Sequence, residues 1–309
     1  MDGNQAGRAA LGRWARIVAV LGAGAAMLGA HYREYRAGVP HAREAANLLA
    51  GHPTAVTTFG WSRTRQYHLV PAESWGRFAA LDSAERQVIH KLNRIDADHV
   101  RRRWLVVPDS FDTELSYSPL PASLPALATV PKFILVSREM QAFGAYEKGA
   151  LIRWGPTSTG KRATPTDSGL FFTNWKSRQA ISTDDPSWLL DWYVNFVALK
   201  GIAFHQYDLP GRPVSHGCVR LLEVDARWIY QWSEEWVPGR GSEVKRYGTP
   251  VLVMGDYDYA APAPWLGLPT NPRAHQLGPS AVDSALAPHA AVILARSSAP
   301  TLGAPLALR

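Results

Sequence analysis

Residues 205–221 read HQYDLPGRPVSHGCVRL, and they place the only cysteine of this 309-residue chain, Cys218, beside two histidines and a glycine. A cysteine reacts as its thiolate, which is scarce at neutral pH unless an imidazole or another positive group lies near. His205 and His216 are the two candidates. The turn sequence DLPG at 208–211 lets the chain double back, so that His205 approaches Cys218. The grouping predicts a thiol nucleophile with its base.

Two motifs extend this prediction: SHGCVR at residues 215–220 and TPTDSGLF at 164–171. The first resembles the SHGC[IV]R signature of the L,D-transpeptidase (YkuD-type) family, and His205 stands where that family has its upstream histidine. The second is similar to the family's TPxGxF segment, and GIAFH at 201–205 is similar to the strand that leads into the histidine. Gln206 departs from the family, in which glycine commonly follows that histidine. The resemblance covers residues 131–255.

The resemblance implies a mainly β catalytic domain over 131–256, a YkuD-like β-sandwich with a packed helix. FILV at 133–136 predicts a buried strand, and the turns EKG at 147–149 and KG at 200–201 predict two hairpins of a mainly antiparallel sheet. TPVLVM at 249–254 predicts the last strand. A helix over 222–236, with its tryptophans in the core rather than stacked on carbohydrate, is predicted by the apolar spacing of Trp228, Ile229, Trp232 and Trp236.

The chemistry that the resemblance implies is an acyl transfer without cofactor or metal. Cys218 attacks the carbonyl at the L-centre of diaminopimelate in a peptidoglycan stem tetrapeptide, releases D-alanine and leaves a thioester. A second stem's amine then resolves the thioester. His205 takes the thiol proton and returns a proton to the departing amine, a role that suits an imidazole because its pKa lies near working pH. For His216, holding positive charge near the sulfur, placing the substrate and a structural role are left open.

Other residues of the two motifs are candidates for substrate and transition-state contacts. Gly217 lets the backbone turn tightly before the nucleophile, and the amides of Gly217 and Cys218 are natural oxyanion donors. Arg220 either binds a substrate carboxylate in a bidentate manner or forms a buried ion pair.

Four further candidates lie around the nucleophile. Ser215 is expected to orient a histidine by hydrogen bonding. Thr164, Thr166 and Gly169 are expected to shape the loop that faces the site. We therefore group these four with Arg220 as substrate-binding candidates.

Three alternatives stand beside the transpeptidase prediction. His205, His216 and Cys218 are a ligand set for zinc, although the HExxH spacing of metallopeptidases is absent. An L,D-carboxypeptidase would resolve the thioester with water. A non-catalytic wall-binding protein would use only an upstream module. The acceptor is also open between a stem peptide, a lipoprotein or other protein amine, a D-amino acid and water.

The N-terminus predicts export. Arg8, Arg13 and Arg16 precede an apolar run at 17–30, which is typical of a signal peptide, but Leu28 at the third position before a cut after Ala30 leaves an uncleaved membrane anchor open. Basic residues before the run predict a periplasmic or extracytoplasmic location in the cell envelope. An unpaired thiol in an oxidising compartment also favours a chemical role. The net charge of +7 comes without a nucleic-acid-binding motif, so no nucleic-acid partner is expected.

The remaining segments divide the chain. Residues 1–30 are the export segment, 31–65 a linker, 66–109 a small α/β module, 110–130 a proline-punctuated linker and 257–309 a Pro/Ala-rich tail that we expect to be disordered. The module is predicted as strand (67–70), helix (72–81), helix (83–95) and strand (104–107). Its second half resembles the end of a LysM module, and its first half, with ESW at 73–75, departs from that pattern.

Overall fold

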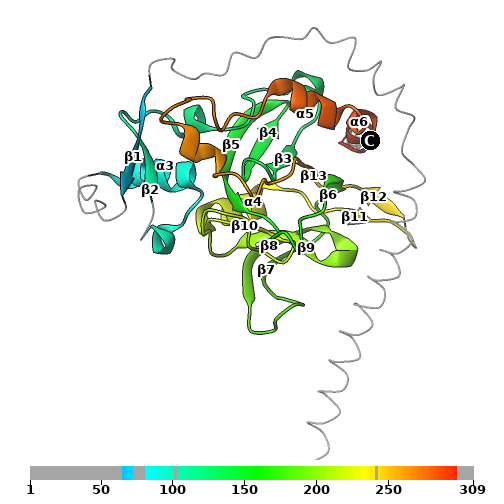
Figure 1. Ribbon diagram of the computed structural model, residues 1–309. Coiled ribbons are helices and arrows are strands. Elements are labelled where there is room, and N and C mark those ends of the chain that lie inside the picture. Colours follow the sequence, from blue (N-terminus) through cyan, green and yellow to red (C-terminus); the bar gives the residue numbers. More distant parts are fainter. Residues whose placement is uncertain (1–64, 72–80, 101–103, 241–242, 298–309) are drawn as a thin grey trace, which may run out of the picture.

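A single curled β-sheet organises the computed structural model, which describes residues 65–71, 81–100, 104–240 and 243–297 (Figure 1). The strand order is β6-β13-β3-β4-β5-β10-β9-β8-β7, mostly antiparallel, with the pairs β13–β3 and β10–β9 parallel. Although β6 and β8 stand far apart in this order, they lie close in space, so the expected sandwich takes the form of one curled sheet. The strands are β3 (Phe133–Ser137), β4 (Ala142–Glu147), β5 (Ala150–Ser158), β6 (Gly169–Phe172), β7 (Lys176–Ile181), β8 (Leu189–Val197), β9 (Ile202–Gln206), β10 (Val219–Leu221) and β13 (Pro250–Met254).

The sheet has an apolar core on each face, because its central strands alternate large side chains between the two. In β3, Ile134 and Val136 enter the core inside the curl, together with Phe204 and Val219. Phe133 of the same strand enters the core on the outer face. The mainly β catalytic domain expected from the sequence is confirmed.

The two predicted hairpins form at their predicted turns. Lys148 and Gly149 both have positive φ, 48° and 77°, which is the conformation of a two-residue turn that matches the twist of its strands. A side chain at Gly149 would collide with the carbonyl of Leu124. At the second turn, a short 3₁₀ helix η5 (Ala198–Lys200) ends at Gly201, whose φ is 65°.

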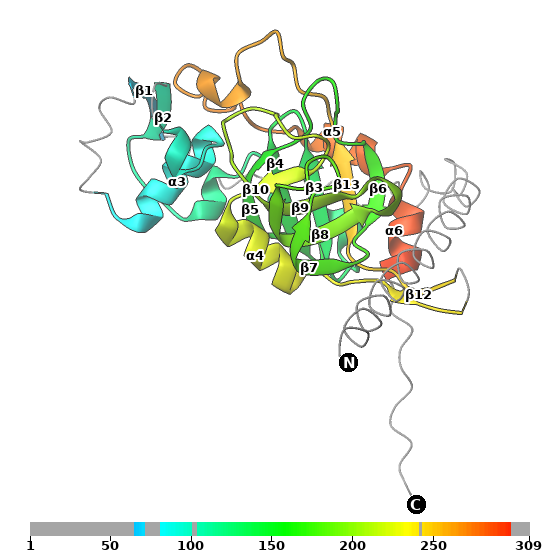
Figure 2. The ribbon, with the colours of Figure 1, turned by 90° about the horizontal axis from the view of Figure 1, so that it is seen from below.

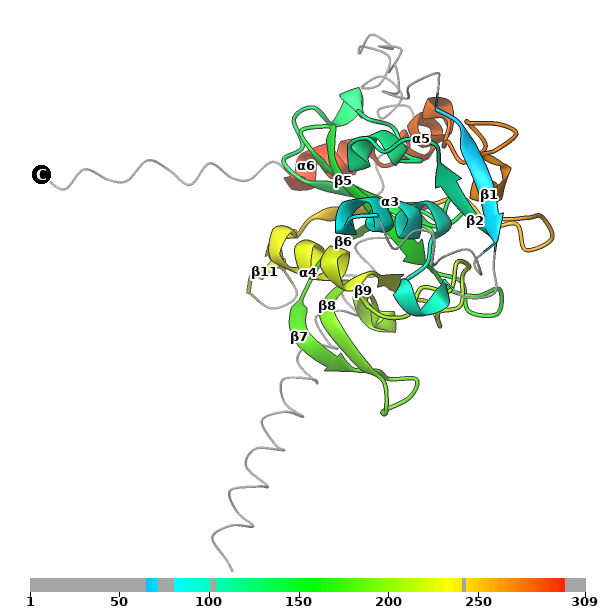
Figure 3. The same ribbon diagram turned by 90° about the vertical axis from the view of Figure 1, so that its left-hand side faces the viewer.

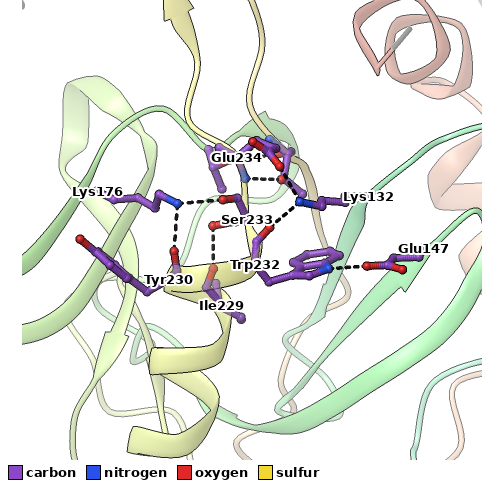
Figure 4. Close-up of polar contacts among 10 residues, drawn as sticks. Lys132, Glu147, Lys176, Ile229, Tyr230, Trp232, Ser233 and Glu234 are labelled. Carbon is purple, nitrogen blue, oxygen red and sulfur yellow. Dashed lines mark hydrogen bonds and ion pairs between the residues drawn. The ribbon is translucent and has the colours of Figure 1, made fainter. Parts of the chain in front are cut away.

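The helix predicted behind the nucleophile is α4 (Glu223–Trp232), which packs against β8 and β9. Its C-terminal carbonyls, which have no partner within the helix, accept hydrogen bonds from Lys176, at the start of β7, and from Lys132, just before β3 (Figure 4). Lys176 Nζ lies 2.9 Å from the Tyr230 oxygen, and Lys132 Nζ lies 2.8 Å from the Trp232 oxygen. A cation at this end also interacts favourably with the helix dipole.

The predicted helix is shorter than expected, because Ser233 adopts an extended conformation and leaves Trp236 outside it. Trp228 and Trp232 are half-buried and stack with ring centroids 4.9 Å apart. Trp232 Nε1 also donates to a Glu147 carboxylate oxygen at 2.7 Å (Figure 4). These tryptophans therefore pack within the protein, as predicted.

The N-terminal module comprises β1 (Tyr67–Pro71), α3 (Ser83–Asn93), η2 (Ala97–His99) and β2 (Trp104–Pro108), with β1 and β2 antiparallel. Both predicted strands and the second predicted helix are present. Most of the first predicted helix, together with the export segment and the linker up to residue 64, lies outside the described residues. The module lies to one side of the β domain (Figures 2 and 3), where α3 contacts β5, the middle strand of the order. Leu92 and Val106 join the outer-face core, so the module shares a core with the β domain.

Two segments that were expected to be a linker and a disordered tail are instead ordered and packed on the domain. The expected linker 110–130 contains two 3₁₀ helices, η3 (Glu114–Tyr117) and η4 (Pro125–Leu127), and buries Tyr117 and Leu127 completely. Residues 257–297 of the expected disordered tail form η6 (Pro264–Gly267), α5 (Pro279–Leu286) and α6 (Ala290–Ser297). Trp265, Leu286 and Ile293 fill the outer-face core, so a few well-spaced large side chains order a segment rich in proline and alanine.

A two-stranded ribbon, β11 (Val237–Pro238) and β12 (Val244–Arg246), completes the structure and lies near α6 (Figure 2). Within the described ranges, no helix is long and apolar enough to cross a bilayer. The apolar run at 17–30 lies outside those ranges.

If α5 is part of the outer-face core, Leu286→Ala should lower the free energy of unfolding by about 2–5 kcal/mol, the usual cost of a cavity at a buried leucine. The matched control is Leu115→Ala, because Leu115 is 42% exposed. Urea unfolding followed by tryptophan fluorescence measures both. Equal, small losses for the two variants would contradict the packing of the C-terminal helices.

Candidate active site

The site forms where β10 pairs in parallel with β9. The register places Val219 beside Phe204 and Arg220 beside His205, so Cys218 enters β10 next to Ala203. Side chains alternate between the two faces of a strand. Val219 and Phe204 face the inner core, and the side chains of Cys218, Arg220 and His205 share the opposite face.

These three side chains line one small pocket. Its walls are completed by residues of the β7–β8 loop, the start of β8 and the loop between the two histidines; the lining residues are Ser182, Asp184, Trp188, Leu190, His205, Tyr207, Ser215, His216, Cys218 and Arg220. The structure therefore brings together five of the predicted site residues. Gly217 lies within the nucleophile loop, while Thr164, Thr166 and Gly169 lie outside the pocket lining.

Cys218 is half-buried, and its Sγ donates to the carbonyl oxygen of Gly201 at 3.7 Å. The same oxygen accepts from the Tyr193 hydroxyl at 2.7 Å. Burial raises the pKa of the Cys218 thiol to about 11, an effect that a backbone hydrogen bond only partly offsets. The Cys218 sulfur is therefore a protonated thiol that is hydrogen-bonded to a carbonyl in the turn between β8 and β9.

His205 is oriented as a base. Its Nδ1 lies 2.9 Å from the carbonyl oxygen of Gln206, and because a carbonyl only accepts, Nδ1 carries the proton and Nε2 keeps its lone pair. The ring is 3% exposed, and this burial is the main reason that its pKa falls to about 4; the charge of Arg220 lowers the pKa further. His205 is thus neutral and able to accept a proton across the physiological range.

The two shifts together define the resting state as a neutral thiol and a neutral imidazole. Burial disfavours the charged form of each group, so a thiolate and an imidazolium do not persist before substrate binds. A neutral imidazole in the same pocket as a protonated thiol has the lone pair that is needed to accept the thiol proton.

His216 lies at the exposed mouth of the pocket, against Trp188 at a ring-centroid distance of 5.2 Å. Its Nε2 accepts from Lys161 Nζ at 2.7 Å, since an ammonium group only donates. The cation at this position is therefore the Lys161 ammonium group, which lies against the His216 ring. Of the roles left open by the sequence, this geometry favours shaping the mouth of the pocket.

The nucleophile loop is held by Ser215 in a way that the sequence did not suggest. The Ser215 hydroxyl donates to the Cys218 carbonyl at 2.5 Å and accepts from the Gly217 amide at 3.1 Å, so it orients the loop and not a histidine. Gly217 has a φ of 122°, which explains the glycine. Because its amide is already engaged, the expectation that Gly217 serves as an oxyanion donor is not met, and the Cys218 amide is left as the candidate.

Arg220 points its guanidinium over the ring of Tyr207, 4.5 Å from the centroid. Burial is the main cause of the lowered pKa of Arg220. Within the described part of the chain, none of the ion pairs includes Arg220. Because Asp208 acts on the guanidinium only at a distance longer than an ion pair, the position of Arg220 at the pocket wall favours the carboxylate-binding interpretation over the ion-pair one.

The TPxGxF-like segment supports the nucleophile loop from behind. The buried Thr166 hydroxyl donates to the Gly217 oxygen at 2.7 Å and accepts from the Gly160 amide at 2.9 Å. Thr164 donates to the Ser215 oxygen at a longer 3.3 Å. Gly169, with a φ of 122°, begins β6 and pairs with Val253. These contacts give the two threonines a positioning role and leave Gly169 a part of the sheet.

Sequence reasoning missed Tyr207, Trp188 and Lys161. Tyr207 stands two residues after His205, so strand alternation would place both on one face. Trp188 and Lys161 come from distant loops, and no local pattern marks them. Among the described residues, no three His, Cys, Asp or Glu side chains are placed to hold a metal ion, so the geometry does not favour the zinc alternative.

The raised pKa predicts a characteristic pH dependence of Cys218 alkylation. Because the thiol of the folded protein titrates at about 11, its rate with iodoacetamide should keep rising from pH 7 to pH 10. Mass spectrometry of the alkylated protein measures the rate, and Cys218→Ala is the blank. A rate that levels off below pH 8 would indicate a thiolate–imidazolium pair and contradict the neutral resting state.

Loss of the Thr166 hydroxyl should destabilise the loop. Thr166→Val leaves the Gly217 oxygen and the Gly160 amide without their partner, at a cost of about 1–3 kcal/mol per buried group. Thr164→Val is the matched control, because its longer hydrogen bond is partly exposed, and it should cost less than about 1 kcal/mol. Thermal and urea unfolding compare the two. The reverse order of stabilities would refute the support assigned to Thr166.

Comparison with protein families agrees with the motifs. Residues 131–253 match the family model of the YkuD L,D-transpeptidase catalytic domain, which confirms the resemblance for this segment. No curated protein matches the chain.

Solved structures with similarity to part of this chain include three L,D-transpeptidases. One from Mycobacterium smegmatis is 22% identical, over 41% of this chain and 59% of its own, with a TM-score of 0.33. One from Stackebrandtia nassauensis is 24% identical, over 41% and 57%, with a TM-score of 0.34. L,D-transpeptidase 3 from Mycobacterium tuberculosis, in complex with a faropenem-derived adduct, is 22% identical, over 41% and 61%, with a TM-score of 0.32. This chain thus spans about three fifths of their length.

Proposed function

Because residues 131–253 match the L,D-transpeptidase catalytic domain, we propose that this protein is a peptidoglycan L,D-transpeptidase that acts through a Cys218 thioester. The observation that carries the proposal is the pocket shared by Cys218 and by His205, whose Nε2 has a free lone pair. The substrate is a stem tetrapeptide, and the acyl acceptor is the amine of a second stem.

The first half-reaction forms the thioester. The sulfur of Cys218 bonds to the carbonyl carbon at the L-centre of diaminopimelate while His205 Nε2 takes the thiol proton. The tetrahedral intermediate then collapses, the bond to the D-alanine nitrogen breaks, and His205 returns the proton to that nitrogen. The Cys218 amide is the protein donor proposed for the oxyanion, an interaction commonly worth a few kcal/mol.

The second half-reaction reverses the roles. An acceptor amine attacks the thioester carbon, His205 removes a proton from the amine, and the thiol of Cys218 is restored. Arg220 offers a bidentate site for a carboxylate of the stem peptide, and the Lys161 ammonium adds positive charge at the pocket mouth. Both cations suit an anionic peptide.

Two other functions differ from this one in a single measurable step. In an L,D-carboxypeptidase, water would replace the amine, and released tripeptide would be the product. A non-catalytic wall-binding protein would form no thioester. The buried base and the thiol in one pocket favour catalysis over wall binding. A lipoprotein amine, another protein amine or a D-amino acid is a further acceptor class for the same thioester.

The substrate requires a site outside the cytoplasm, and the N-terminal sequence supports it. The arginines that precede the apolar run at 17–30 are typical of an exported or membrane-anchored chain. We therefore propose a periplasmic or other extracytoplasmic location in the cell envelope. Protease protection of the tagged protein in intact cells and in spheroplasts tests this location.

The thioester can be trapped. With a diaminopimelate-containing stem tetrapeptide, intact-mass spectrometry should show one acyl adduct on the wild-type protein, release of D-alanine and cross-linked peptide dimers. Cys218→Ala should form no adduct. Folded wild-type protein that neither gains mass nor releases D-alanine would refute the proposal, whereas tripeptide without dimers would identify water as the acceptor.

The two histidines of the motif provide a matched pair of variants. His205→Asn removes the base and should lower the rate of acylation by about 10²–10⁴-fold, the usual contribution of general base catalysis. His216→Asn keeps the base and should lower it less than about tenfold. Stopped assays of D-alanine release measure both rates. Equal losses would show that the assignment of the base to His205 is wrong.

A further inference from the structure

The loop between the two histidines is fastened to the N-terminal module. Leu209 donates its amide to Asp96 Oδ2 at 2.7 Å, and the Asp96 amide donates to the Leu209 oxygen at 3.2 Å. Two residues further along the loop, the Gly211 amide donates to the Arg94 oxygen at 2.9 Å. Ile95 and Pro210 form an antiparallel bridge between these contacts. Residues 94–96 thus pair with residues 209–211 as a short ladder.

Residues 94–96 form the rigid side of this ladder, because Arg94 is held by many contacts. Arg94 ends α3 in the left-handed conformation, with φ of 57°, and its guanidinium is fully buried. Its side chain donates to the carbonyl oxygens of Met140, Lys91 and Leu92 and lies near the rings of Trp154 and Trp265. Such a conformation is unfavourable for a residue other than glycine unless its surroundings hold it. Here these contacts hold the turn that directs Asp96 toward the loop.

The two carboxylate oxygens of Asp96 have different hydrogen-bond partners, and these fix the orientation of the side chain. Oδ1 accepts from the amides of Asp98 and His99, each at 3.0 Å, and from His99 Nδ1 at 2.7 Å. Oδ2 is thereby left to face the Leu209 amide. A hydrogen bond from an amide to an ionised carboxylate is stronger than one between neutral groups.

The loop that receives this bond forms one wall of the pocket. Tyr207, two residues before Leu209, lines the pocket and lies under the Arg220 guanidinium. On the far side of the turn, Ser158 Oγ fastens the loop again, through the Arg212 oxygen at 2.8 Å and the Val214 amide at 3.2 Å. The loop is thus held by β9 before the turn and by Ser158 after it. The turn itself, residues 209–211, is held by its hydrogen bonds to residues 94–96.

We propose that Asp96 is a positioning residue of the transpeptidase, and that the N-terminal module acts as an internal brace for the substrate-binding wall of the active site. This inference rests on the proposed function. The brace acts on the Tyr207–Arg220 wall and leaves Cys218 and His205 in place, so its loss raises KM for the stem tetrapeptide more than it lowers kcat.

The test uses the full chain with Asp96→Ala, and with Asp98→Ala as the matched control. Asp98 carries the same type of side chain two residues away, is exposed, and contributes only its backbone amide to this network. Hydrogen exchange measured by mass spectrometry should show at least tenfold faster exchange at the amides of Leu209 and Gly211 in Asp96→Ala. Exchange within β9 should not change, and Asp98→Ala should match the wild type.

Steady-state kinetics distinguish a positioning role of Asp96 from an effect on the stability of the protein alone. At a temperature well below unfolding, KM for the stem tetrapeptide should rise about tenfold in Asp96→Ala, the factor that corresponds to about 1.4 kcal/mol. Asp96→Asn keeps an uncharged acceptor oxygen and should give an intermediate value. The rate of Cys218 alkylation by iodoacetamide should remain that of the wild type.

Each contrary outcome has its own meaning. Unchanged exchange at residues 209–211 overturns the brace. Faster exchange with unchanged KM overturns the positioning role and leaves Asp96 a structural residue. A wild-type protein that turns over no tetrapeptide overturns the proposed function and the kinetic part of this inference, while the exchange measurement still decides whether the module holds the loop.

Discussion

The parallel pairing of β10 with β9 is the constraint on which the site depends. It places Arg220 beside His205 and Cys218 next to Ala203. The loop that joins β9 to β10 turns back on itself, which makes this pairing possible. β10 has only three residues, Val219–Leu221, and β5 pairs with it on the other side through Arg220 and Leu221. A short strand between two longer ones has little freedom to slip, because a shift of one residue would turn the nucleophile into the inner core.

Around this pairing, the Cys218 thiol and the His205 imidazole are both uncharged at neutral pH. Burial alone accounts for most of the shift of both pKa values, upward for the thiol and downward for the imidazole. The positive charge at the pocket is carried by groups that do not enter the bond-making step, Arg220 and Lys161. This separation favours a mechanism in which charge develops only during the reaction, where oriented dipoles stabilise it most effectively.

Local sequence patterns predicted the parts of the structure that depend on neighbouring residues. The buried strand β3, both hairpin turns and the helix α4 all follow from alternation, turn residues or helical spacing. The SHGC motif marked Cys218, which the structure places in one pocket with His205. The sequence did not predict that Ser215 and Thr166 support the nucleophile loop, because their partners are carbonyls and amides that become neighbours only through the tertiary fold. The packing of residues 110–130 and 257–297 was missed for a related reason: their large apolar residues are sparse, and only the folded sheet shows that its outer face is the surface they cover.

The outer-face core combines residues from opposite ends of the described chain, with Tyr67 and Ile293 in one cluster. Such a core has a high contact order, and closing so large a loop costs chain entropy before any contact compensates it. The cluster cannot be completed until α6 has been synthesised and has docked. Until then, the apolar outer surface of β3 and β4 stays only partly covered and is open to non-native contacts.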